Sequence, residues 1–132
     1  MKTNRLFPLR RLMVAALACL GVAGFTGCTQ VLVSPETRGE YKLGELQVFV
    51  DRDFNTAYLA AKNGMKDFGL FEVRDDRLAI EAELNGRDPT DTLVIVKIKE
   101  IGKNRTSVKI RYGLKGDLPS SQRVFSSIEK RL

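Results

Sequence analysis

Cys28 is the residue whose type and position most clearly indicate chemistry, because a thiol at this point of the chain can accept lipid. Residues 1–11 contain basic side chains and no acid, and residues 12–20 are wholly apolar. A charged start, an apolar run and small residues before a cut are typical of a secretory signal peptide. The chain then reads Phe25-Thr26-Gly27-Cys28, which matches a lipoprotein cleavage site except that Phe25 replaces the usual Leu, Val or Ile. We expect residues 1–27 to be removed and Cys28 to be acylated.

Two alternatives stay open for this segment. The chain could keep it as an uncleaved anchor, although a spanning helix needs about 20 apolar residues and this stretch is short and rich in glycine. Cys19, which follows Ala-Leu-Ala, is a rival acceptor, but cleavage there would halve the apolar run. Thr29 follows Cys28 in place of the aspartate that is associated with inner-membrane retention. In a Gram-negative cell the periplasmic face of the outer membrane is therefore favoured.

Other chemistry is sparse. The chain has no histidine, which removes the commonest general base and a frequent metal ligand. Acylation of Cys28 would leave no thiol for catalysis, thiolate metal binding or a disulfide. Asp51 and Asp53 could form a carboxylate pair, but capping of a helix explains them more simply. We expect no catalytic residue, no metal and no cofactor.

Three further motifs have structural interpretations. The pairs Ser120-Ser121 and Ser126-Ser127 lie on a predicted helix with no candidate base nearby. Residues 113–117 resemble a phosphate loop superficially, but they lack the spacing of one and are better explained as a turn followed by the capping residue Asp117. Asp75-Asp76 is expected to form a tight turn, because a calcium loop would need more acids.

A ladder of cations on two neighbouring strands is the second candidate site. If residues 92–99 and 105–112 form a hairpin around Gly102-Lys103, Val96 lies opposite Ile110 and faces the core. Lys97 then lies opposite Lys109 on the other face. We call the set of four basic residues on that face the basic ladder: Lys97, Lys99, Lys109 and Arg111.

Like charges directly opposite one another destabilise a sheet, so the basic ladder suggests an anionic partner. Lipid headgroups, lipopolysaccharide phosphates or an acidic protein surface would fit. A solvated face neutralised by Glu81 and Glu83 on the next strand is the simpler alternative. Leu93 and Ile95 add an apolar edge to the same face, which favours a protein contact.

The charge balance agrees with an ordinary surface. The whole chain carries +6, with 22 basic and 16 acidic residues. Four of the basic residues and no acid lie in residues 1–27, so the mature part has 18 basic and 16 acidic residues and a net charge of +2. This balance gives no support for nucleic-acid binding.

The elements that would position these residues follow from hydrophobic spacing. Residues 28–43 show no sustained period and read as the acylated N-terminus and a tether, although residues 31–33 could instead dock on the fold or dip into the lipid headgroups. Residues 44–132 are expected to form one domain, beginning with an alternating strand over 44–50. Apolar residues over 54–68 then follow helical spacing, with Asp51 or Asp53 as the cap and Gly69 as the stop.

Four strands and a helix complete the prediction. The strands are expected at 70–74, 78–84, 92–99 and about 105–112, and the helix at about 119–131 with Asp117 as its cap. The predicted fold is α+β: an antiparallel sheet of about five strands with two helices on one face, in the order β-α-β-β-β-β-α.

The chain resembles a known family at several short motifs. They include Gly44-Glu45-Leu46, Asp67-Phe68-Gly69-Leu70, Ile80-Glu81-Ala82 and Ile110-Arg111-Tyr112-Gly113 with Gly116-Asp117. Their order is similar to that of the small bacterial lipoproteins classed as domain of unknown function 3568. The resemblance implies an exported, acylated α+β domain and assigns no activity or catalytic residue.

Two functions follow from these observations. The first is a non-enzymatic, membrane-anchored envelope lipoprotein that serves as an accessory or protein-interaction module. The alternative is a periplasmic domain that binds a small molecule or lipid between the sheet and the long helix. A binder needs an unfilled pocket with a few polar groups, whereas the aromatic residues of this chain look sufficient for a solid core.

Overall fold

A computed structural model describes residues 27–132, so most of the predicted signal peptide lies outside the described residues. Within this range the chain forms one seven-stranded sheet in the order β1-β2-β3-β7-β6-β5-β4, with every neighbouring pair antiparallel. The elements are β1 (Thr29–Leu32), β2 (Arg38–Lys42), β3 (Glu45–Val50), α2 (Phe54–Phe68), β4 (Phe71–Arg77), β5 (Glu81–Arg87), β6 (Leu93–Gly102), β7 (Arg105–Tyr112) and α3 (Leu118–Glu129).

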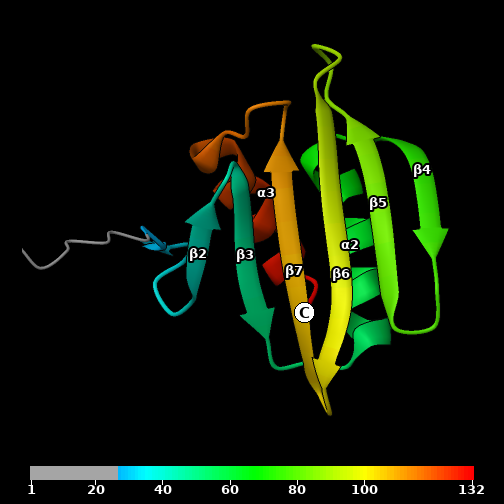
Figure 1. The fold of residues 1–132 in the computed structure, drawn as a ribbon. Helices are drawn as coiled ribbons and strands as arrows, with labels where there is room; N and C mark the ends of the chain where they lie inside the picture. Colours follow the sequence, from blue (N-terminus) through cyan, green and yellow to red (C-terminus); the bar gives the residue numbers. More distant parts are fainter. Residues whose placement is uncertain (1–26) are drawn as a thin grey trace, which may run out of the picture.

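Both helices of residues 27–132 lie side by side on one face of the sheet (Figure 1). Their apolar stripes and the inward residues of the central strands form a single core, in which Val96, Ile110 and Phe125 are fully buried. The other face of the sheet has no helix over it (Figure 1). The α+β class and the two helices on one face are therefore confirmed.

The ends of the helices follow the predicted signals. Asp53 caps α2 by accepting a hydrogen bond from the Thr56 backbone N–H at 3.0 Å. Gly69 ends α2 in the left-handed region, with φ 97°, a conformation that glycine adopts at low cost. Asp117 caps α3 in the same way through the Ser120 backbone N–H.

The predicted order is wrong at its start, because the stretch expected to be a tether forms β1 and β2. Residues 29–32 pair with 38–41, and β2 continues the sheet from β3. The connecting turn is held by α3, where the Glu129 carboxylate accepts hydrogen bonds from Ser34 Oγ at 3.1 Å and Thr37 Oγ1 at 2.5 Å. Val33 is buried, so the alternative in which residues 31–33 dock on the fold describes it better.

The boundaries of β4 and β5 also differ from the prediction. The strand expected at 78–84 begins at Glu81, and Leu78 and Ile80 remain exposed in the turn before it. Asp75-Asp76, expected as a turn, lies within β4. Contacts with α2 explain this, since the Asp75 carboxylate accepts hydrogen bonds from Tyr58 Oη and Lys62 Nζ, each at 2.7 Å.

The two helices approach most closely at Gly64 of α2. A Cβ atom added there would lie 2.5 Å from Cα and 2.7 Å from the backbone nitrogen of Ile128 on α3. Gly64 weakens α2 by about 1 kcal/mol relative to alanine. The structure shows the reason for it, because only glycine leaves room for the backbone of α3.

We predict that Gly64→Ala destabilises the protein although it raises helix propensity. Overpacking typically costs about 1–3 kcal/mol, which exceeds the gain of about 1 kcal/mol in propensity. Urea unfolding should show a lower midpoint for Gly64→Ala. The control is Asn63→Ala, since Asn63 is exposed and gains propensity without a clash. Equal stabilisation by both substitutions would contradict the proposed contact.

Candidate functional site

The basic ladder lies on the open face of the sheet, in the predicted register. Val96 pairs with Ile110, and Lys97 pairs with Lys109 across β6 and β7. Lys97 and Lys99 are exposed, and Lys109 and Arg111 are half-buried. The four cations are therefore adjacent on two central strands.

The neighbours of the basic ladder are acidic or polar. On the β5 side, Glu83 pairs with Lys97 and Glu81 with Lys99. On the β3 side, Arg111 Nη2 lies 3.2 Å from Glu45 Oε1, and the residue opposite Lys109 is Gln47. Among residues 27–132, the three lysines of the ladder form no ion pair within 4.0 Å. The face therefore carries a central stripe of cations between two stripes that contain acids.

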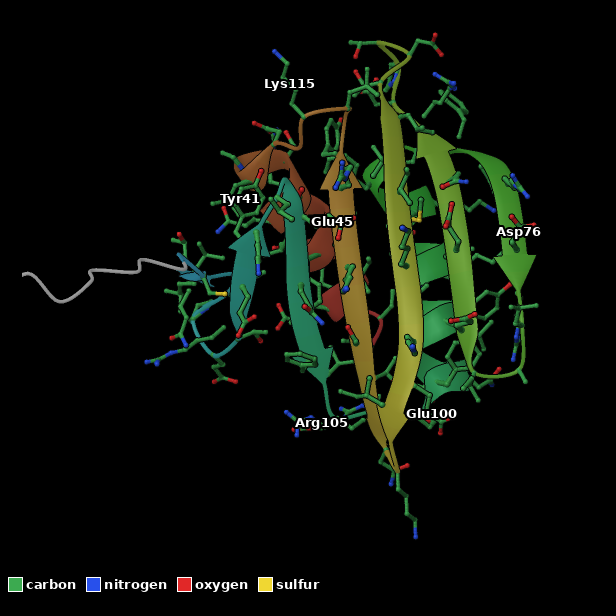
Figure 2. All side chains as sticks on the ribbon, in the orientation of Figure 1. Tyr41, Glu45, Asp76, Glu100, Arg105 and Lys115 are labelled. Carbon is green, nitrogen blue, oxygen red and sulfur yellow. The ribbon has the colours of Figure 1, made fainter. Side chains whose placement is uncertain are left out.

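The open face is hollowed around the ladder. A shallow depression of about 660 Å³ is bounded by Lys97, Lys99 and Lys109 on one side and by Glu81 and Glu83 on the other. A second depression of about 290 Å³ shares Lys97 and Lys109 and extends to Glu45, Ile95 and Arg111. Figure 2 shows side chains standing on this face of the sheet, with Glu45 near the start of β3. Surfaces of this kind suit a partner that offers carboxylate or phosphate groups and also tolerates nearby acids.

The other candidate residues lie at helix caps or within α3. Asp53 and Asp117 are the N-caps described above, and each has its pKa lowered, first by the side-chain hydroxyl of Thr56 or Ser120. Ser121 is buried on α3, and its hydroxyl has no hydrogen-bond partner among the described residues. Ser126 Oγ donates to the Gln122 carbonyl oxygen at 3.0 Å.

Carboxylates with shifted pKa values are all stabilised in the charged form within the described chain. The hydroxyls of Thr90 and Tyr112 lower the pKa of Asp88 to about 2. Hydrogen bonds from Lys62 and then Tyr58 lower the pKa of Asp75. None of these groups is arranged as a neutral acid at pH 7. Residues 27–132 also contain no group of three side chains placed to hold a metal.

A separate groove runs between α2 and β4 at the edge of the sheet. Its volume is about 530 Å³, and its apolar wall includes Met65, Leu70 and Phe71. Lys62 and Lys66 stand on its rim; Lys62 contacts Asp75 at 2.7 Å and Glu72 at 3.7 Å. An apolar wall with cations at the rim fits an amphiphile with an acidic head. This groove lies where the alternative function expects a ligand, between the sheet and the long helix.

Sequence reasoning missed two leucines in turns. Leu43 ends the stretch predicted as a tether, and Leu114 lies in the loop before α3; their side chains are 84% and 92% exposed. Each has a lysine and a glycine beside it in the sequence, as Lys-Leu-Gly and Gly-Leu-Lys. That composition was the available signal, but only the fold shows that the two turns meet.

A family model described as a protein of unknown function (DUF3568) matches residues 11–131. No curated protein matches the chain. In the part of the chain that the structure describes, neither helix is long and apolar enough to cross a membrane.

We predict that Lys109→Gln stabilises the protein. Lys109 faces Lys97 on one side and the uncharged Gln47 on the other, so removing its charge removes repulsion without breaking a directly opposite ion pair. The gain should be a few tenths of a kcal/mol, at the lower end of cross-strand pair energies of about 0.2–1 kcal/mol. It should shrink at high salt, where surface charges are screened. Thermal unfolding would measure both effects.

Lys103→Gln is the matched control for this change, because Lys103 is exposed in the turn between β6 and β7. It removes the same charge away from the ladder. A loss of stability in Lys109→Gln, or an equal gain in both variants, would contradict the proposed repulsion.

Proposed function

The chain belongs to the DUF3568 family of proteins of unknown function, and from that premise we propose that it is a non-enzymatic, membrane-anchored lipoprotein of the cell envelope. Its domain serves as an accessory module that binds another envelope component. We assign it to the periplasmic face of the outer membrane in a Gram-negative cell, because Thr29 and not aspartate follows Cys28.

The position of Cys28 is the observation that carries this proposal. Its thiol is exposed, and β1 begins at the next residue. Lipid on this sulfur would therefore lie outside the fold and disturb no core contact. Two or more acyl chains hold a protein on a bilayer stably where one chain does not.

The open face of the sheet supports the role of an interaction module. Its basic ladder includes three lysines with no carboxylate at ion-pair distance among the described residues, and the half-buried Leu93 and Ile95 adjoin it. The flanking Glu81 and Glu83 would repel a uniformly anionic membrane. A protein surface of mixed charge is a better match.

Binding of an amphiphile in the groove between α2 and β4 is the second candidate function. The groove favours it by its volume of about 530 Å³ and its apolar wall, which fall within the range of ligand sites. Phe71 stands on its edge with 66% of its side chain exposed, so a bound acyl chain would bury a large apolar group.

We predict that Cys28→Ser abolishes acylation. Cells grown with labelled palmitate should give a labelled protein that begins at Cys28, whereas the variant should carry no label and keep residues 1–27. Cys19→Ser is the matched control and should be labelled and processed normally. Label in Cys28→Ser, or its loss in Cys19→Ser, would contradict the assignment of the lipid to Cys28.

We predict that the basic ladder is needed to capture a partner. A photoactivatable residue at Ile95, beside the ladder, would be crosslinked in native membranes of cells that express the full chain. One variant changes Lys97, Lys99, Lys109 and Arg111 to Gln. The matched control removes four exposed charges elsewhere, by changing Arg38, Lys66, Lys103 and Lys130 to Gln.

The expected result is an envelope protein crosslinked to the intact chain and to the control, and lost from the ladder variant. Equal crosslinking by all three chains would show that the ladder is not the contact. Absence of any crosslinked protein, together with an amphiphile in an organic extract of the purified chain, would favour the second candidate function.

A further inference from the structure

Two turns at one end of the sheet are locked together by glycines. They are the β2–β3 turn, Leu43-Gly44, and the loop between β7 and α3, residues 113–116. A Cβ on Gly44 would lie 2.4 Å from the Lys115 carbonyl oxygen, and a Cβ on Gly116 would lie 2.1 Å from the Gly44 carbonyl oxygen. Because the backbones touch, the two turns form one unit.

This unit carries two exposed leucines, each next to an exposed lysine in the sequence. Leu114 and Leu43 are the most exposed of the large apolar side chains in the described chain, at 92% and 84%. Lys42 and Lys115, their neighbours in sequence, are exposed as well. Figure 2 shows Lys115 pointing away from the body of the domain. Single exposed apolar residues are ordinary, but paired leucines with flanking lysines are the composition of a surface that binds lipid.

The backbone conformation at Leu43 is also unfavourable for a leucine. The β2–β3 turn has two central residues, with φ 53° at Leu43 and φ 80° at Gly44. Two-residue hairpin turns with positive φ at both positions prefer Asn-Gly, and a large side chain such as leucine is uncommon there. Neither the turn nor the core explains this leucine, so a contact outside the domain is the remaining physical reason.

The N-terminus of the described chain lies at the same end. Thr29 pairs with Tyr41, which is two residues before Leu43. At about 3.4 Å per residue along a strand and about 5 Å between strands, Cys28 lies within about 10 Å of Leu43. Figure 1 shows the β2–β3 turn and the β7–α3 loop at the end of the sheet toward which β2 runs.

Exposed apolar side chains at the opposite end do not share this position. Leu78, Ile80 and Ile101 are about half exposed there. Ile101 lies eight residues along β6 from Leu93, or about 26 Å at the usual rise of a strand. Leu93 is at the end that carries the two leucines, since its carbonyl oxygen accepts a hydrogen bond from the Gly113 N–H. Cys28 therefore lies beside the end of the sheet that carries Leu43 and Leu114, and away from the end that carries Ile101.

We propose that the unit of Lys42, Leu43, Leu114 and Lys115 inserts into the bilayer interface beside Cys28 and fixes the orientation of the domain. The proposal rests on the membrane anchoring proposed above. The leucines enter the boundary between headgroups and acyl chains, and the lysines contact lipid phosphates. Three carboxylates at this end of the sheet each have a partner: Asp117 caps α3, Asp88 accepts a hydrogen bond from Tyr112 Oη, and Asp91 lies 3.3 Å from Arg87 Nη1. The open face of the sheet stays outside the bilayer.

The test uses tryptophan, because the chain contains none. Full-length protein, purified from membranes with its own lipid, is reconstituted into vesicles of neutral and anionic phospholipids, with or without bromine on the acyl chains. The Leu114→Trp chain should emit at a shorter wavelength than free tryptophan in buffer. Brominated lipid should quench its emission. Ile101→Trp, at the opposite end, should show water-like emission and no quenching.

A second variant tests whether Leu43 contributes to the insertion. Leu43→Asn restores the preferred turn, so in the Leu114→Trp chain it should raise the unfolding midpoint and yet reduce quenching. Vesicle flotation distinguishes membrane anchoring through Cys28 from insertion of the two leucine turns. A chain that does not float would overturn the anchoring and the insertion together. If the chain floats but Leu114→Trp is quenched no more than Ile101→Trp, the insertion alone would be overturned. A blue shift without quenching would indicate self-association and would also overturn the insertion.

Discussion

The close approach of α2 and α3 at Gly64 determines how much of the sheet is covered. Seven strands about 4.8 Å apart span about 29 Å, whereas two helices, each about 10 Å wide, cover about 20 Å. The missing side chain at Gly64 brings the helices together against Ile128, so they cover the central strands and leave the margins. At the β4 margin this leaves the groove of about 530 Å³ beside α2. At the other margin, side chains of α3 reach the β1–β2 hairpin.

The N-terminal hairpin depends on that contact with α3. Glu129 accepts hydrogen bonds from Ser34 and Thr37, and Gln122 Nε2 donates to the Leu32 carbonyl oxygen at 2.9 Å. These bonds hold the turn and the end of β1, and pairing with β2 extends to Thr29, so little free chain separates Cys28 from the fold. An acylated Cys28 would then limit how the domain can lie on a membrane, which a flexible tether would not.

The parts that sequence reasoning predicted are those with strong local signals. The helical spacing over 54–68, the caps at Asp53 and Asp117 and the alternation in β6 and β7 each depend on nearby residues, and the structure confirms them. The register of Lys97 against Lys109 followed from a short turn between two alternating strands. The basic ladder and the face of the sheet that carries it could thus be predicted from the sequence alone.

The parts that it missed depend on contacts distant in sequence. β1 and β2 are short, with Pro35 between them, and they are stabilised by α3 some 90 residues later. Leu78 and Ile80 continue the alternation of β5, but alternation alone does not show where the partner strand ends. The contact of Gly44 with Gly116 has no periodic signal at all, so the meeting of the turns that carry Leu43 and Leu114 could not be predicted.

Two surface features of the domain work against local stability, and both lie where the helices leave the sheet open. Lys97 faces Lys109 across a ladder in which like charges repel, and Leu43 occupies a left-handed turn position that suits asparagine. At the caps and at Gly69, by contrast, local preference and fold agree. Sequences that agree with their fold at most positions tend to depart from it where they bind something else. The basic ladder and the leucine turns face different directions, one across the sheet and one off its end. An anchored domain needs two such surfaces, one toward the membrane and one toward a partner.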